Sequence, residues 1–488
     1  MVFSSLIFIY AFLPIFLIIY FLIPGKSPKW IMVRNAVLLI GSLYFYAYGE
    51  YYYVIIMIFS ILINYLLALG LGEKKEKSFS AAKAERARKG IMVFALFINL
   101  GILFFFKYYL FFAENINNLI LTVTKDMSVP VFLLPEVRLE NPVGISFYTF
   151  QILSYVIDVY RRKYPPEKNI LVMGTYIAMF PQLIAGPIVE YPEVRDSLRN
   201  RKVEAKDLDM GIKTFIMGLA AKVVLANQIG ILWSDLARIG YESISTPLAW
   251  MGAFAYSFQI YFDFFGYSLM AIGLGRMMGF SFPDNFKDPY ASCSVTEFWR
   301  RWHITLGRWL KNYLYIPLGG SRCSMAKTIR NIFFVWLFTG LWHGADWNFI
   351  IWGMLFFVLA LAEKLFWGKI LKKCKPLSVL YMLLVIPLSW VIFAIQDLSA
   401  LQVYFTRLFP FIPHSYASNV ASGDYLRYGA NYAFLFGMSV VCCIPAVRHW
   451  FEKQRETKFG VLLYLGMFFV SIYFLALGLD NPFLYYRF

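Results

Sequence analysis

The sequence predicts an all-α protein that crosses a membrane many times. Of its 488 residues, 60% are hydrophobic and 15% are charged, whereas soluble domains are nearer half apolar and a quarter charged. Apolar runs recur from one end of the chain to the other, and several approach the roughly 20 residues that a helix needs to cross a bilayer. No linker or shift in composition divides residues 1–488, so we expect a single intramembrane domain.

Ten apolar runs are candidate membrane helices. They are residues 4–23, 35–48, 53–71, 91–112, 143–160, 212–233, 249–280, 379–395, 428–445 and 460–477. The run 35–48 is short for a span, so we expect it to be shifted or tilted. The run 4–23 is longer than the core of a signal peptide and has no basic residue before it, so we expect it to remain as a membrane helix.

The basic residues orient these runs. The formal net charge of +17 lies largely in short loops, which is the positive-inside pattern of a membrane protein rather than a nucleic-acid surface. Three basic residues follow the first run, none lies in the turn after the second, and seven lie in residues 73–90 after the third. This alternation places the N-terminus outside and residues 73–90 in the cytoplasm.

Two apolar stretches do not fit a straight span. Residues 170–190 and 331–363 each have basic residues on both flanks, and both contain helix-breaking or polar residues. We therefore expect re-entrant hairpins or broken helix pairs there. Because non-helical backbone at membrane depth must be buried in protein or line a wet cavity, a site is expected in these stretches.

Several kinds of site are excluded by the motifs. The five cysteines lack zinc-ligand spacing, and two of them, Cys442 and Cys443, lie in an apolar run, so we expect neither a metal site nor a disulfide. No serine-hydrolase elbow and no zinc-protease helix is present. The glycine pair at 319–320 lacks the ending of a nucleotide-binding loop.

Two of the four histidines are candidates for chemistry. His343 lies in Thr-Gly-Leu-Trp-His-Gly-Ala-Asp-Trp-Asn-Phe at 339–349. An imidazole within a membrane suits a general base that removes a proton from an acceptor hydroxyl, although a buried histidine can also join two helices by hydrogen bonds. His414 and His449 fall in a predicted outer loop and a predicted cytosolic helix end, so we interpret both as surface residues.

His303 ends the run Glu-Phe-Trp-Arg-Arg-Trp-His at 297–303. One interpretation is purely structural: a helix at the membrane surface, with its usual aromatic residues and arginines. The other is functional: the cytosolic entrance of a site for a polyanionic acyl donor, since arginine and lysine bind phosphate groups. The candidate donor-binding residues are Arg300, Arg301, Arg308 and Lys311.

Motifs along the whole chain resemble the membrane-bound O-acyltransferase (MBOAT) superfamily, in the branch of alginate and peptidoglycan O-acetyltransferase membrane subunits. The matching segments begin with Met-Val-Phe-Ser-Ser at 1–5 and include residues 141–151, 180–187, 261–264, 297–303, 313–320, 339–344 and 481–488. Where relatives often carry a serine and an acid after Asp263, this chain has Phe265 and Leu269.

The resemblance implies a ring of about ten to eleven transmembrane helices, with re-entrant segments, around a central tunnel. It assigns the catalytic role to His343 and a second functional role to His303. Tyr148 and Asn348 are candidates for orienting the donor or stabilising an oxyanion, and Trp342 and Asp346 complete the supporting set.

The resemblance also implies the reaction. Acetyl-CoA, a donor substrate rather than a permanently bound cofactor, is expected to supply an acetyl group for O-acetylation of an extracytoplasmic polysaccharide. Transfer is direct or passes through an SGNH-type acetyltransferase outside a bacterial plasma membrane. Two alternatives stay open: D-alanyl transfer toward teichoic acid, and a transporter without chemistry, although no inverted repeat favours the latter.

Overall fold

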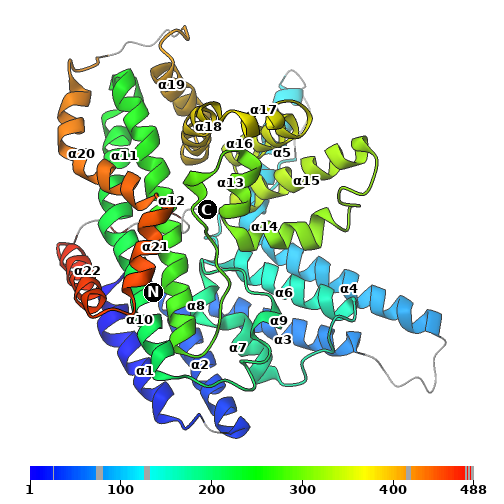
Figure 1. Cartoon of the computed structure of the whole chain (residues 1–488). Coiled ribbons are helices and arrows are strands. Elements are labelled where there is room, and N and C mark those ends of the chain that lie inside the picture. Colours follow the sequence, from blue (N-terminus) through cyan, green and yellow to red (C-terminus); the bar gives the residue numbers. More distant parts are fainter. Residues whose placement is uncertain are drawn as a thin grey trace.

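The computed structural model of the chain describes residues 1–25, 27–72, 81–125, 132–413, 419–478, 481 and 484. His414, part of the cytoplasmic run 73–90 and most of the 481–488 motif lie outside these residues. All regular structure in the described part is helical (Figure 1). This agrees with the predicted all-α membrane protein.

The α-helices of the N-terminal half lie within residues 13–239. They are α1 (Leu13–Leu22), α2 (Pro28–Gly49), α3 (Val54–Leu71), α4 (Ala81–Leu103), α5 (Tyr109–Thr124), α6 (Ile145–Tyr160), α7 (Ile170–Ala178), α8 (Phe180–Leu183), α9 (Tyr191–Val194), α10 (Ala205–Ala220) and α11 (Asn227–Ile239). Short π-helical turns precede α1 at Phe8–Phe12 (η1), join α4 to α5 at Phe104–Tyr108 (η2) and join α10 to α11 at Ala221–Ala226 (η3).

The second half begins with the longest helix. Its helices are α12 (Thr246–Met277), α13 (Val295–Arg301), α14 (Ile304–Leu310), α15 (Met325–His343), α16 (Trp347–Ala362), α17 (Gly368–Lys373), α18 (Lys375–Ala394), α19 (Leu398–Leu408), α20 (Asp424–Cys442), α21 (Pro445–Gln454) and α22 (Lys458–Ala476). Further short turns are η4 (Tyr241–Ser243), η5 (Pro289–Ala291), η6 (Lys311–Tyr315) and η7 (Glu363–Trp367).

Seven helices in the described part are long and apolar enough to span a membrane, or eight if the bent pair α20 and α21 is one span. Others that the sequence predicts as spans are shorter in the structure, such as α6 with 16 residues. The run 35–48 belongs to the 22-residue helix α2, which begins earlier than predicted. Arg34 breaks the apolar pattern there, but its guanidinium bonds to the carbonyl oxygen of Ile23.

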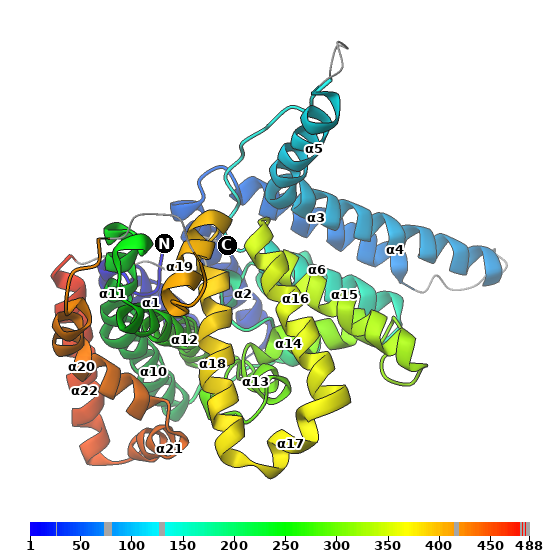
Figure 2. The ribbon, with the colours of Figure 1, turned by 90° about the horizontal axis from the view of Figure 1, so that it is seen from above.

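The two stretches that do not fit a straight span are both broken helices. Residues 170–190 fold as α7 and α8 followed by an extended segment. Residues 331–363 fold mainly as α15 and α16, which pack against each other and are separated by 344–346. Figure 2 shows α13 and α14 between this pair and the helices α10 to α12, so the broken segments face the interior of the molecule.

Helix α12 packs closely against α10 because glycines face each other at their contact. A Cβ atom added to Gly266 would lie 2.6 Å from the carbonyl oxygen of Gly218, and one added to Gly273 would lie 2.6 Å from that of Gly211. Small residues permit such close approach of helices in membranes, where packing rather than the hydrophobic effect drives association. The α10–α12 pair therefore forms a rigid centre for the site.

Both chain ends are anchored to this centre. The side-chain amide of Asn481 donates to the carbonyl oxygen of Ser4 at 2.6 Å and accepts from the Asn227 amide at 2.9 Å. The backbone N–H of Leu484 donates to a carboxylate oxygen of Asp263 on α12 at 3.0 Å. These bonds fasten the described tail residues to Ser4 near the start of the chain and to α12.

We predict that Gly266→Ala destabilises the protein, because the new methyl group has no room beside Gly218. Overpacking of this kind costs about 1–3 kcal/mol. The matched control is Gly437→Ala on α20, where a Cβ atom meets nothing within 4 Å and alanine is the better helix former. Thermal unfolding in detergent measures both variants. A Gly266→Ala protein as stable as the control would contradict the close helix contact.

Candidate active site

Helix α15 ends at His343, and side chains of η2 cap it by donating hydrogen bonds to its last carbonyl oxygens. The N–H of Gly344 donates to the carbonyl oxygen of Gly340 at 3.4 Å, and the hydroxyl of Tyr108 donates to that of Leu341 at 2.9 Å. The ammonium of Lys107 donates to the carbonyl oxygens of Trp342 at 2.6 Å and of His343 at 3.3 Å. The last four carbonyl oxygens of the helix, which lack partners within it, are therefore all hydrogen-bonded.

The cap holds the backbone of Trp342 and His343 in place. A cation at the C-terminus of a helix also interacts favourably with the helix dipole. The Lys107 ammonium makes a third bond to the Ser146 hydroxyl on α6 at 3.3 Å, so it links three segments. It projects from η2, a π-helical turn, and such turns often occur at functional sites.

The imidazole of His343 lies at the end of a small cavity. Asn141, Gly144, Ser146 and Lys107 line the cavity together with His343, and its volume is about 20 Å³. This volume holds one water molecule. The loop charges place residues 73–90 in the cytoplasm, so the segment after the apolar run 91–112, which leads to Asn141, is predicted to lie outside, and this cavity is predicted to face the outside. His343 is thus neither against lipid nor packed on all sides.

Aromatic rings hold the His343 side chain on its other sides. Its ring centroid lies 4.9 Å from that of Trp342, 5.1 Å from that of Trp352 and 5.1 Å from that of Phe393. Only 3% of the residue is exposed. The imidazole therefore has a defined orientation before any substrate binds, which is what a general base requires.

His303 lies in the short break between α13 and α14. Its backbone has φ of 46°, in the left-handed region, where residues other than glycine are uncommon. Strained backbone of this kind clusters at functional sites. Its Nδ1 lies 3.2 Å from Oδ1 of Asn285, and the same oxygen accepts hydrogen bonds from the N–H and the hydroxyl of Thr305. Nδ1 of the neutral ring therefore carries the proton, and Nε2 carries the lone pair.

A second cavity reaches His303 from the opposite side. It has a volume of about 180 Å³ and is lined by His303, Trp299, Lys311, Tyr315, Trp336 and Thr339. The same loop charges predict that this side faces the cytosol. Thr339 in this cavity and His343 in the first one are four residues apart on α15, which is about one helical turn of 5.4 Å.

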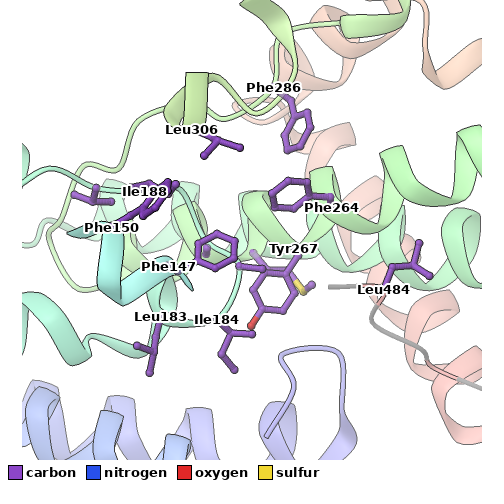
Figure 3. Close-up of a cluster of buried hydrophobic side chains, with 14 of the residues drawn as sticks. Phe147, Phe150, Leu183, Ile184, Ile188, Phe264, Tyr267, Phe286, Leu306 and Leu484 are labelled. Carbon is purple, nitrogen blue, oxygen red and sulfur yellow. The ribbon is translucent and has the colours of Figure 1, made fainter. Parts of the chain in front are cut away.

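Aromatic side chains separate the two cavities. The Trp342 ring lies 5.7 Å from His303 and 5.3 Å from Phe147, and Phe264 lies 4.7 Å from His303 on a further side. Figure 3 shows Phe147 from α6 and Phe264 from α12 within the same buried cluster. Among the described residues, the two cavities share no lining residue. The predicted tunnel is therefore divided by this aromatic partition.

Of the four predicted donor-binding residues, one lines the His303 cavity. Lys311 is part of its wall, whereas Arg300 is exposed on α13 and lines neither cavity. Arg301 forms an ion pair with Glu297 at 2.6 Å. Glu297 and Arg301 are four residues apart on α13, so this ion pair is local to one helix.

Arg308 is also bound within the protein. Its guanidinium lies 2.7 Å from a carboxylate oxygen of Glu193 and 3.4 Å from one of Glu190. Burial raises the pKa of Glu190, and the nearby Arg308 opposes that shift. Arg308 therefore joins α14 to α9 and to the segment that precedes it, and its charge is largely compensated.

The predicted supporting residues differ in whether they line one of the two cavities. Trp342 lines the His343 cavity, whereas Tyr148 and Asp346 line neither of the two cavities. The Asn348 amide donates to the carbonyl oxygens of Ile392 and Phe393, and the Phe393 ring contacts the His343 ring.

The sequence interpretation missed Lys107 and Asn285. Lys107 is the one basic residue in the apolar run 91–112, and an ionisable residue within a membrane span is by default a functional candidate. Asn285 gave no such indication, since it lies in an ordinary polar loop. The residues at which the chain departs from the resemblance, Phe265 and Leu269, line a different cavity.

Comparisons with known proteins show which family this chain resembles. The statistical model of the membrane-bound O-acyltransferase family matches residues 158–374. A probable alginate O-acetylase of Pseudomonas putida is 34% identical over the full length of both chains. A peptidoglycan O-acetyltransferase of Helicobacter pylori is 34% identical over 83% of this chain and 79% of its own. A teichoic acid D-alanyltransferase of Bacillus subtilis is 27% identical over 48% of this chain and 62% of its own.

We predict that Lys107→Met lowers the stability of the protein, because two carbonyl oxygens of α15 lose their donor. An unsatisfied buried acceptor costs about 1–3 kcal/mol. Lys107→Arg, which keeps the charge and the donors, is expected to retain most of the stability. The control is Lys364→Met in η7, an exposed lysine in another π-helical turn. Thermal unfolding of the three variants in detergent tests the cap. Equal melting temperatures for Lys107→Met and the control would refute it.

Proposed function

The chain belongs to the membrane-bound O-acyltransferase family, and we propose that it moves an acetyl group from cytosolic acetyl-CoA to an acceptor outside the membrane. The observation that carries the proposal is the placement of two histidines on either side of Trp342, each lining its own cavity. A donor and an acceptor that approach from opposite sides need such an arrangement.

The donor enters the His303 cavity in this proposal. The thioester end of acetyl-CoA reaches past Lys311 toward His303 and Trp342, while its phosphate groups stay at the cytosolic mouth, where lysine is a suitable partner. Movement of the aromatic partition then lets the acetyl group meet His343. The His303 ring, held by Asn285, orients the thioester.

The chemical step takes place beside His343. The imidazole removes the proton of an acceptor hydroxyl, and the oxygen attacks the thioester carbonyl carbon. The new C–O bond forms as the C–S bond breaks, and the coenzyme A sulfur leaves and takes up a proton. The acceptor becomes an acetyl ester, and the imidazole returns to its neutral form.

The acceptor is an extracytoplasmic polysaccharide or the hydroxyl of an SGNH-type partner that passes the acetyl group on to one. Relatives named for alginate and for peptidoglycan O-acetylation match more than four fifths of this chain, and these names support a polysaccharide as the final acceptor. The same relatives support a bacterial plasma membrane as the location. D-alanyl transfer is the second candidate, because a teichoic acid D-alanyltransferase also resembles part of the chain.

We predict that His343→Ala abolishes coenzyme A release from acetyl-CoA by the purified protein. Loss of a general base lowers rates by about 10²- to 10⁴-fold. His449→Ala is the control, because His449 is exposed and its ring bonds only within α21. A thiol reagent follows coenzyme A release in liposomes that contain a hydroxyl acceptor. Full activity of His343→Ala would contradict the proposed mechanism. Turnover only with a D-alanyl carrier protein would favour the second candidate.

We predict that Lys311→Gln raises KM for acetyl-CoA about tenfold and leaves kcat nearly unchanged, because removal of ground-state binding affects KM. The truncated donor acetyl-pantetheine, which lacks the nucleotide phosphates, should show no such change. Arg300→Gln is the matched control outside the cavity. If both donors respond equally to Lys311→Gln, Lys311 does not bind the phosphate groups.

A further inference from the structure

An apolar cavity lies between the C-terminal helices and the central pair α10 and α12. Its volume is about 550 Å³, and Ala221, Phe262, Met438, Phe459, Leu462 and Gly466 are among its lining residues. Figures 1 and 2 both show α22 beside α10 at one side of the molecule, and α20 packs against α11 and α12. Phe459 and Leu462 on α22 are strongly exposed, so the cavity is open toward the surrounding bilayer.

A polar cavity of about 510 Å³ adjoins this apolar one. The two cavities share Met217, Phe265 and Arg448 as lining residues. The polar cavity lies against the ends of α10 and α12 that the loop charges place in the cytoplasm. An apolar cavity that continues into a polar one has the shape required by an amphiphile.

The polar cavity carries uncompensated positive charge. Arg448 is paired with Asp288 at 2.7 Å and with Glu452 at 2.6 Å, and both bonds hold its guanidinium in place. In the part of the chain that the structure describes, Lys202 and Arg455 line the cavity without a carboxylate partner.

A third cation and one acid remain in the wall. Lys287 also has no ion pair within the described ranges, and Asp284 is the one lining acid without a paired cation there. Three free cations against one free acid favour an anionic occupant. The Nε atom of Arg455 is buried and has no hydrogen-bond partner among the described residues, so it retains a donor for such a group.

The bend between α20 and α21 indicates where the two cavities lie relative to the membrane surface. These helices meet at 78°, and α21 carries both charged residues, such as Arg448, and aromatic ones, such as Phe451. A helix of this composition that turns away from the spanning direction suits the membrane interface. The polar cavity therefore lies at the depth of lipid head groups, and the apolar cavity lies at the depth of acyl chains.

We propose that the two cavities together bind one anionic phospholipid. Its phosphate lies among Lys202, Lys287 and Arg455, and an acyl chain fills the apolar cavity between α22 and the centre. This site shares no described lining residue with the two cavities at His343 and His303, so the lipid is not the acyl donor. The lipid joins α22 to the rest of the protein.

The test is the thermal stability of delipidated protein with added lipid. A ligand that binds only the folded state stabilises it in proportion to its occupancy, and we expect phosphatidylglycerol to raise the melting temperature by roughly 4 °C. Phosphatidylcholine with the same chains should give less than about a third of this shift, since it has no net charge. Equal shifts with both lipids would overturn the proposal.

Two variants separate the polar and apolar halves of the site. Lys202→Gln combined with Arg455→Gln should remove most of the difference between the melting-temperature shifts that the two lipids cause. The control is Lys453→Gln on α21, which should keep that difference because Lys453 lines neither cavity. Gly466→Leu fills the apolar cavity without a clash, because a Cβ atom there meets nothing within 4 Å, and should reduce the shift. A full shift in either site variant contradicts the proposal.

Glycerol 3-phosphate is the final probe, because it carries the anionic group without acyl chains. Only a small shift is expected, since the apolar cavity then stays unfilled. A shift as large as that with phosphatidylglycerol would identify the site as one for soluble phosphate compounds. That result would also overturn the proposal.

Discussion

The structure depends on one constraint, which is that a helix that ends inside a membrane cannot leave its last carbonyl groups without donors. Helix α15 ends at His343, and Lys107 and Tyr108 from a different segment complete its hydrogen bonds. Unsatisfied backbone groups in hydrocarbon each cost several kcal/mol. The same ammonium therefore permits the helix break, holds the backbone at His343 and links α6 to the end of α15.

Close packing provides the frame in which this break can occur. Glycines bring α10 and α12 together, and α12 presents Phe264 to His303. Aromatic rings surround much of the two histidines, and the Trp342 ring separates their cavities. In the proposed reaction, in which substrates enter from both sides of the membrane, such a partition prevents an open pore for ions and protons.

The basic residues near His303 do not all face its cavity, although they are neighbours in the sequence. Four cations near His303 form a basic run, yet Arg301 and Arg308 are bound to Glu297, Glu190 and Glu193. Lys311 alone of the four lines the cavity. The partners of the two arginines lie partly on other elements, and a run of basic residues cannot reveal them.

The sequence by itself determined the membrane class, the helical composition, the two broken stretches and the candidates His343 and His303. These follow from local properties, namely apolar runs, loop charge and motifs. Only the tertiary structure decided which side chains surround the histidines, since Lys107 lies 236 positions before His343 and Asn285 lies outside the motif of His303. Hydrogen bonds and ring contacts depend on distance in space, and no spacing along the sequence encodes that distance.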